Sequence, residues 1–103
     1  MSDERMVRIA EIEVDPARLD AYKALLAEVG RASLELEPGV LMLHSVSLKD
    51  APTHIRVFEV YASRAAYEEH IQTPHFLSYK ADTADMVTAL HLIEVDPILL
   101  AAK

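Results

Sequence analysis

The chain contains no cysteine and no tryptophan, and its only glycines are Gly30 and Gly39. The absence of cysteine excludes disulfides, a thiolate nucleophile, iron–sulfur clusters and cysteine-ligated zinc. Two glycines cannot form a dinucleotide-binding fingerprint or a phosphate-binding loop, and the Gly-x-Ser-x-Gly motif of α/β-hydrolases is also missing. If the protein is an enzyme, we expect it to work without a tightly bound metal, flavin or nicotinamide cofactor.

Basic residues are also scarce, since the 103-residue chain has 10 Lys and Arg against 17 Asp and Glu, a formal net charge of -7 at pH 7. Such an acidic protein repels nucleic acid and anionic membrane surfaces, so we expect neither as a partner. No apolar run approaches the roughly 18 residues of a membrane-spanning helix. The first five residues lack the apolar segment of a secretion signal. We therefore expect a cytoplasmic protein with a single domain over residues 1–103.

Apolar periodicity and helix-start signals predict the secondary structure. β-branched residues favour strands at residues 6–14, 40–48, 54–61 and 89–95, with a hairpin loop at 49–53. Asp15-Pro16, Ser63 and Thr73-Pro74 predict the starts of helices that end near residues 37, 71 and 87. Gly30 weakens the first helix by about 1 kcal/mol and marks either close packing or fraying. The β-α-β-β-α-β order is typical of an α+β ferredoxin-like fold with a four-stranded antiparallel sheet.

The predicted strands are apolar on both faces. Successive side chains point to opposite faces, so Val7 and Ile9 lie opposite Ala10 and Ile12, and the third and fourth strands repeat this pattern. Two helices cover only one face of a four-stranded sheet. We therefore expect a second copy of the chain to cover the other face, in a homodimer packed sheet to sheet. In the alternative, a monomer has a second face that is wetted by four charged residues, Arg8, Glu11, Arg56 and Glu94.

Three runs of residues stand out, namely Glu59-Val60-Tyr61, Ala66-x-x-x-His70 and Gln72-Thr73-Pro74-His75-Phe76-x-x-Tyr79. They resemble the antibiotic biosynthesis monooxygenase (ABM) family, and in particular its quinol monooxygenase-like branch. The resemblance implies a dimeric α+β barrel and a cofactor-free oxygenase that uses O2 on a small phenolic, quinol or polyketide-like substrate. Tyr61 stands where the family usually has tryptophan. The haem-degrading branch uses Asn, Trp and His, and haem degradation is not expected because the matching positions here are Ile12, His70 and Lys80.

Oxygenation without a cofactor needs a neutral base, a few hydrogen-bond donors and an apolar pocket, because the substrate must supply the electrons as an anion. We expect His75 to be the catalytic base. It follows Thr73-Pro74 at the start of a helix, whose positive end keeps the imidazole neutral. The alternative is that His75 only supports the helix start. His70 and Tyr61 are expected to orient the substrate at the catalytic centre, or else to be an ordinary helix-end histidine and core tyrosine.

The expected substrate-binding residues are Glu59, His44, Phe76 and Tyr79. Glu59 either forms an ion pair with an arginine, Arg8 or Arg56, or has a raised pKa and acts as a second base. The histidine is otherwise a core or interface residue, and the two aromatic residues are otherwise ordinary core. The spacing of the histidines gives no support to a zinc site, which only the tertiary structure could build from His44, His70, His75 or His91.

Two other functions stay open. Isomerisation of a small hydroxyketone would use the same base without O2. A phosphorylated substrate would then need Arg56 or Lys80 to converge on the free N–H groups behind Thr73. A non-catalytic dimeric binding or stress-response module would instead have a pocket that is filled by its own side chains.

Overall fold

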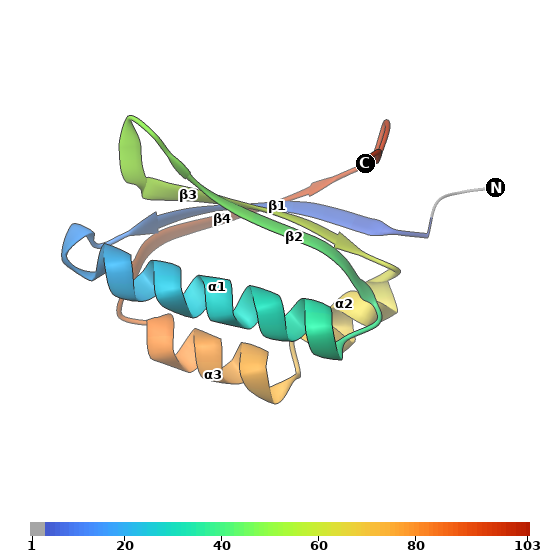
Figure 1. Ribbon diagram of the computed structural model, residues 1–103, viewed down its shortest axis with the longest axis horizontal. Helices are drawn as coiled ribbons and strands as arrows, with labels where there is room; N and C mark the ends of the chain where they lie inside the picture. Colours follow the sequence, from blue (N-terminus) through green and yellow to red (C-terminus); the bar gives the residue numbers. More distant parts are fainter. Residues whose placement is uncertain (1–3) are drawn as a thin grey trace.

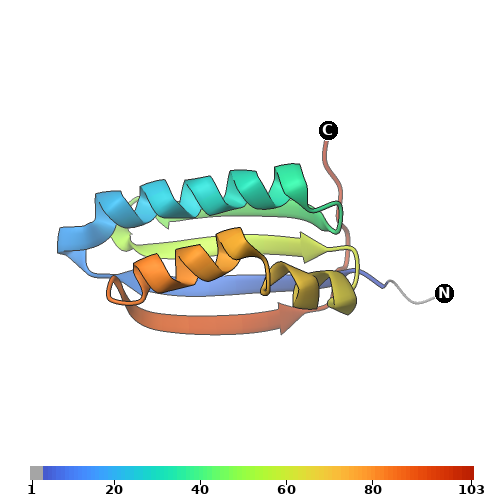
Figure 2. The ribbon, with the colours of Figure 1, turned by 90° about the horizontal axis from the view of Figure 1, so that it is seen from below.

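The computed structural model describes residues 4–103, so that residues 1–3 of the N-terminus considered above lie outside the described residues. Its elements, in chain order, are β1 (Met6–Val14), a 3-10 turn (Pro16–Arg18), α1 (Leu19–Leu36), β2 (Val40–Leu48), β3 (Ala51–Tyr61), α2 (Arg64–His70), α3 (Pro74–Thr83) and β4 (Val87–Val95). The strands pair antiparallel in the order β2-β3-β1-β4, and the three α-helices cover one face of the sheet (Figures 1 and 2). This arrangement confirms the predicted α+β ferredoxin-like fold.

Side-chain caps start the helical segments where the sequence predicts them. The carboxylate of Asp15 accepts a hydrogen bond from the backbone N–H of Ala17, and Pro16 opens the 3-10 turn that leads into α1. Ser63 and Thr73 cap α2 and α3 in the same way, by accepting the N–H of the residue three positions further on. Each cap satisfies a donor that the helix itself leaves unpaired.

The β2–β3 hairpin is tighter than predicted. β3 begins at Ala51 rather than at residue 54, and the connection has only two residues, Lys49 and Asp50. The sequence suggests a longer loop because proline is rare inside sheets. The pairing of β3 with β1 ends at His54, so Pro52 has only β2 beside it. The N–H that proline lacks is therefore not needed for a hydrogen bond to β1. Ser47 Oγ also donates to the Pro52 carbonyl at 2.6 Å.

The end of α3 and the start of β4 also differ from the prediction. α3 ends at Thr83 instead of near residue 87, and β4 starts at Val87 instead of 89. The Met86 N–H donates to the Thr83 carbonyl at 2.9 Å, which closes a turn directly after the helix. The Met86 carbonyl then accepts the Asp15 N–H, and Met86 itself is buried. Helical periodicity alone could not show this turn, because a contact with the end of β1 fixes it.

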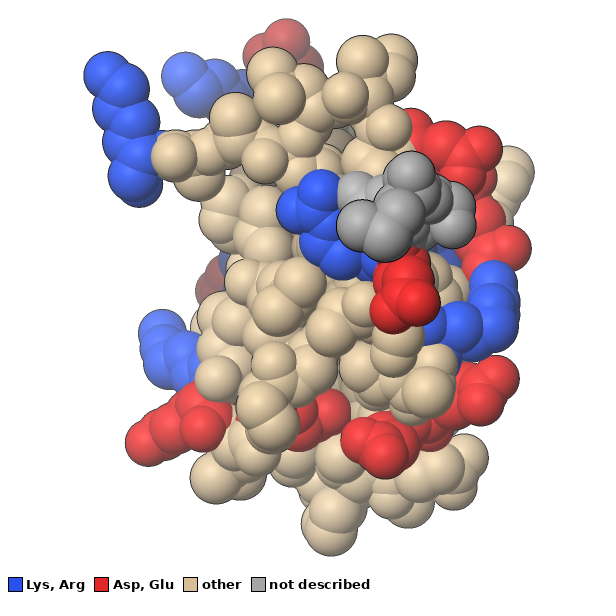
Figure 3. Space-filling view, turned by 90° about the vertical axis from the view of Figure 1, so that its right-hand side faces the viewer, with Lys and Arg blue, Asp and Glu red and all other residues tan. Residues whose placement is uncertain are grey.

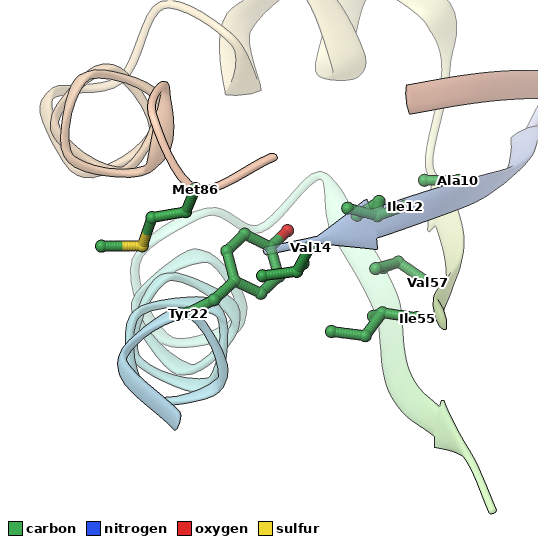
Figure 4. Packing of buried hydrophobic residues seen from close by; sticks show 7 residues of the cluster. All are labelled: Ala10, Ile12, Val14, Tyr22, Ile55, Val57 and Met86. Atoms are coloured by element: carbon green, nitrogen blue, oxygen red, sulfur yellow. The ribbon is translucent and has the colours of Figure 1, made fainter. Parts of the chain in front are cut away.

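The core lies between the sheet and the helices. Figure 4 shows its main cluster, in which Tyr22 of α1 projects toward Val14 of β1, together with Ala10, Ile12, Ile55, Val57 and Met86. A smaller cluster of Met6, Val40 and Tyr61 lies near α2. Tyr22 and Tyr61 are fully buried. The predicted strand faces are confirmed, since Ala10 and Ile12 point toward the helices and their neighbours point away from them.

The opposite face of the sheet, here called the outer face, is not covered by α1, α2 or α3 (Figure 1). One row across it contains His44, Phe58, Ile9 and Ile93. Phe58 is 39% exposed. Of the four charged residues proposed to wet this face, Glu11 and Arg56 lie on it and pair at 3.2 Å. The other two, Arg8 and Glu94, lie opposite each other on the inner face, so this part of the monomer alternative is wrong.

The remaining surface mixes charged and uncharged residues. Seen from the end of the molecule that carries α2, uncharged side chains fill most of the surface, and the basic residues lie scattered among acidic ones (Figure 3). Within residues 4–103, no helix combines the length and the apolar character that a bilayer crossing needs.

Candidate functional site

A cavity of about 360 Å³ lies between the inner face of the sheet and the helices. All four strands and all three α-helices contribute to its wall. Most of the lining is apolar, and its charged or hydrogen-bonding side chains include Arg8, Glu59, Tyr61, Tyr67, His70 and Lys80. An apolar cavity with a few polar groups is the usual form of a site for a small organic molecule.

Gly30 helps to keep this cavity open. It lies in α1 and lines the cavity, and a Cβ placed on it would have no heavy atom within 4 Å. The structure therefore does not show the close packing that was one interpretation of this glycine. It also places Gly30 inside the helix, since α1 continues to Leu36. The missing side chain leaves space for a ligand.

A buried polar network forms one wall of the cavity. The Tyr61 hydroxyl donates to Glu59 Oε1 at 2.5 Å, and an Arg8 nitrogen lies 3.6 Å from the same carboxylate oxygen. Arg8 also donates to the Tyr67 hydroxyl at 2.8 Å, with its guanidinium 4.4 Å from the centre of the Tyr67 ring. Glu59 thus forms the predicted ion pair, with Arg8. The other arginine, Arg56, is on the outer face.

Burial and charge set the protonation of this network. Burial raises the pKa of Tyr61, and the nearby Glu59 carboxylate raises it further. Tyr61 therefore stays protonated at neutral pH, and its hydroxyl donates its hydrogen bond to Glu59. Burial alone would lower the pKa of Arg8, but Glu59 and Tyr67 more than offset this, so the net pKa is raised. Nε of Arg8 is buried without a hydrogen-bond partner within the described residues.

A second polar cluster joins three segments of the chain. Glu37 follows α1, His70 ends α2, and His75 lies in the first turn of α3. His70 Nδ1 lies 3.1 and 3.2 Å from the two carboxylate oxygens of Glu37, and His75 Nε2 lies 2.5 Å from one of them. The side chains of Glu37, His70 and His75 are 13%, 6% and 19% exposed. One carboxylate therefore holds both histidines.

The break between α2 and α3 brings the two histidines together. The His70 carbonyl accepts the N–H of Thr73 at 3.2 Å and its hydroxyl at 2.8 Å. These bonds fold the short linker back on the end of α2, so the first turn of α3 starts beside His70. A five-residue spacing would separate the two rings on one continuous helix. Here it places both of them on Glu37.

The two histidines differ in what they face. His70 lines the main cavity, while His75 borders a smaller one between α1 and α3. Nε2 of His70 has no hydrogen-bond partner among residues 4–103, and it is not among their fully buried unpaired atoms. His70 thus lines the cavity with one ring nitrogen unpaired, and His75 Nε2 donates to the Glu37 carboxylate.

The structure brings most of the predicted site residues to the main cavity. Tyr61, His70, Glu59, Phe76 and Tyr79 all line it. The His70 ring lies 4.9 Å from the Phe76 ring and 5.3 Å from the Tyr61 ring, centre to centre. The positions matched to haem degradation also line this cavity, namely Ile12, His70 and Lys80. The catalytic and binding roles of these residues stay predictions.

Two predicted residues lie elsewhere, and one residue was missed. His44 is exposed on the outer face opposite Phe58, so it cannot contact a ligand in the cavity of its own chain. His75 points to Glu37, as described above. The sequence pattern assigns no functional role to Glu37. A signal was available, because an acidic residue at a helix C-terminus opposes the helix dipole and needs a compensating partner.

Comparisons with known proteins identify the family and agree with the fold. The family model described as antibiotic biosynthesis monooxygenase matches residues 5–82. A solved structure from Bacteroides thetaiotaomicron is 47% identical, with a TM-score of 0.93, over 97% of this chain and 95% of its own. One from Caulobacter crescentus is 21% identical, with a TM-score of 0.88, over 94% and 92%, and shows the same fold. Both are named “putative antibiotic biosynthesis monooxygenase”.

A third structure, named “putative monooxygenase”, comes from Lactobacillus acidophilus. It is 26% identical with a TM-score of 0.86, and the match covers 92% of this chain but only 51% of that one. No protein with a curated description matches the chain. The family model spans most of the sequence, and the Bacteroides structure matches nearly all of it. The chain therefore belongs to the antibiotic biosynthesis monooxygenase family.

Proposed function

We propose that the protein is a cofactor-independent monooxygenase of the quinol monooxygenase-like type. It would use O2 on a small phenolic, quinol or polyketide-like substrate bound in the main cavity. Family membership supports monooxygenase-type chemistry. The observation that carries the proposal is His70, a buried histidine that Glu37 holds at the wall of a mostly apolar cavity.

His70, rather than the predicted His75, is the catalytic base in this proposal. Glu37 accepts a hydrogen bond from Nδ1–H of His70, which leaves the lone pair of Nε2 free to take a proton from the substrate. A carboxylate that orients a histidine in this way also stabilises the imidazolium that forms. His75 is a positioning residue, because it holds the same carboxylate from the other side.

The reaction balances without a cofactor for a phenol that carries hydrogen at its reacting ring carbon. His70 removes the phenolic proton, and the electron-rich phenolate reacts with O2 to form a ring peroxide. Loss of water from this peroxide leaves a quinone. One oxygen atom thus enters the substrate, and the other leaves as water with the two hydrogens that the substrate lost. The apolar wall keeps bulk water from the anion.

The Arg8 network orients the anion. Tyr61 donates to Glu59 and so helps to hold this carboxylate beside Arg8. Arg8 supplies positive charge beside the cavity. A phenolate oxygen is attracted by this charge, because electrostatic interactions are stronger in an apolar site than in water.

Oxygen uptake by the metal-stripped protein tests this function. The panel contains hydroquinones, naphthols, anthrones and catechols, and three variants are compared with the wild type: His70→Ala, His75→Ala and the exposed-site control His91→Ala. We expect catalysed uptake above autoxidation, its loss by about 100-fold or more in His70→Ala, and a smaller loss in His75→Ala. The control removes a histidine of the outer face that does not line the main cavity, so it should keep full activity.

Other outcomes would redirect the proposal. Uptake that survives in His70→Ala but not in His75→Ala would restore His75 as the base. No uptake with any substrate would contradict the oxygenase.

Of the alternative functions, the isomerase of a phosphorylated substrate loses one of its two proposed cations. Arg56 pairs with Glu11 on the outer face, whereas Lys80 lines the cavity. A non-catalytic binding module was expected to fill its pocket with its own side chains. Among the described residues the cavity is instead empty.

The outer face is where we propose that two copies of the chain pair. The row of His44, Phe58, Ile9 and Ile93 is mostly apolar, and α1, α2 and α3 all lie on the other face. Burying this row in a homodimer removes apolar surface from water, which contributes roughly 25 cal/mol for each Å². A homodimer that pairs in this way agrees with the dimeric α+β barrel that the family resemblance implies.

A further inference from the structure

The cluster of Glu37, His70 and His75 has the composition of a transition-metal site. Each residue offers one ligand atom, and the three atoms lie within 4.8 Å of one another. Two imidazole nitrogens and one carboxylate oxygen suit Zn²⁺, Fe²⁺, Co²⁺ and Ni²⁺ much better than they suit Ca²⁺ or Mg²⁺. Among residues 4–103, this is the one cluster of three or more such side chains that is close enough to share an ion.

Two of the three distances between the ligand atoms are already close to those around a metal ion. Ligand atoms about 2.0–2.1 Å from a tetrahedral metal lie roughly 3.3 Å apart. The Glu37 oxygen is now 3.1 Å from His70 Nδ1 and 2.5 Å from His75 Nε2. A metal would therefore replace the two shared protons and separate the closer pair by less than about 1 Å.

The backbone holds the three ligands on different, fixed elements. Glu37 is the C-terminal cap of α1, His70 is the last residue of α2, and His75 is in the first turn of α3. The linker between the two histidines is tied to the His70 carbonyl by two hydrogen bonds from Thr73. A cation balances the carboxylate that opposes the dipole of α1.

We propose that Glu37, His70 and His75 bind one divalent transition-metal ion per chain, with Zn²⁺ or Co²⁺ as the practical probes. The proposal does not depend on the proposed oxygenase function, because binding is measured directly. If both proposals hold, they compete. The ion takes the carboxylate and Nδ1 of His70, so the bound state lacks the hydrogen bond that orients the base.

The experiment is equilibrium dialysis of the untagged, metal-stripped protein against Zn²⁺, with bound metal counted per chain. Co²⁺ is added in parallel, and its visible absorption reports nitrogen and oxygen coordination. Three variants are measured beside the wild type: His75→Gln, Glu37→Gln and His91→Ala. The last removes an exposed histidine that lies 3.9 Å from Glu11, away from the cluster.

We expect one Zn²⁺ per wild-type chain, a loss of affinity of at least about tenfold in His75→Gln and Glu37→Gln, and no change in His91→Ala. Zn²⁺ should also raise the unfolding temperature of the wild type and of His91→Ala only. His75→Gln decides the outcome if Glu37→Gln does not fold, because the His75 side chain is partly exposed at a helix end. Absence of binding to the folded wild type, equal affinity in His75→Gln, or a matching loss in His91→Ala would each overturn the proposal.

Discussion

At the scale of single residues, the buried tyrosines carry a stability that depends on pH. Burial raises the pKa of Tyr22, Tyr61 and Tyr79. Tyr22 and Tyr79 also share a hydroxyl–hydroxyl hydrogen bond of 2.5 Å. In the unfolded chain these groups ionise near pH 10, whereas in the folded chain they keep their protons to higher pH. The folded state therefore binds more protons than the unfolded state in alkaline solution.

We predict that the free energy of unfolding falls as the pH rises above about 10, by roughly 1.4 kcal/mol per pH unit for each such tyrosine. This contribution is fully present below pH 10. Urea unfolding at a series of pH values measures the slope, and absorbance of the phenolate reports ionisation. Tyr22→Phe should show a shallower slope than the wild type. Phenolate signals from all tyrosines before unfolding begins would contradict the prediction.

At the scale of the elements, the two glycines have opposite surroundings. Gly30 in α1 faces open space, whereas a Cβ on Gly39 would lie 2.6 Å from the Cβ of Ala66 in α2. Neither glycine has a positive φ angle. Gly39 is therefore required for the close approach of α2 to the start of β2 and not for a special backbone conformation. Gly30 instead determines how much of the cavity stays empty.

Gly30→Leu should fill the cavity without unfolding the protein. The new side chain enters space that holds no atoms within 4 Å of the added Cβ, and replacing glycine strengthens the helix by up to about 1 kcal/mol. We expect unchanged or higher thermal stability, together with loss of substrate turnover. Gly30→Ala is the matched control, which should gain stability and keep most of its activity. Full activity in Gly30→Leu would show that the substrate binds elsewhere.

Gly39→Ala should destabilise the fold by about 1–3 kcal/mol, because two methyl groups cannot lie 2.6 Å apart and α2 must shift. Denaturant unfolding measures the loss. Ala66→Gly removes the opposing methyl group, so in the double variant Gly39→Ala should cost much less than it does alone. Equal costs in both backgrounds would mean that the contact between these two residues is not the cause.

At the scale of the whole molecule, the outer face is the proposed site of pairing between two copies of the chain. Its apolar row includes Phe58, and its charged pair Glu11–Arg56 lies further along the same strands. We predict that the wild type is a dimer by sedimentation equilibrium and that Phe58→Glu is a monomer with the same circular dichroism spectrum. The exposed-helix variant Leu77→Glu, from a residue on α3 that is 50% exposed, should stay dimeric. A monomeric wild type would refute the proposed sheet-to-sheet pairing.

Local signals in the sequence were sufficient to predict the helices and strands and their order along the chain. β1 and β2 occupy the predicted residues because β-branched and apolar runs end at clear turn or cap residues such as Asp15. The helix starts followed from caps that act over three residues. The errors lie at Ala51, where pairing with the adjacent strand β2 overrides the propensity of Pro52, and after Thr83, where Met86 contacts Asp15, which is distant in the sequence. The strand faces were also predictable, because alternation needs no knowledge of the neighbouring strand.

The arrangement of the candidate site could be identified only from the tertiary structure. The sequence alone determined the fold class, the family resemblance and the aromatic character of the wall around Phe76 and Tyr79, since each depends on local pattern and residue type. Only the folded chain shows that His70 faces the cavity while His75 turns to Glu37, 38 positions away in the sequence. The physical reason is that a hydrogen bond or metal site depends on distances of about 3 Å between side chains. Such distances are set by how α1, α2 and α3 pack, which no short stretch of sequence encodes.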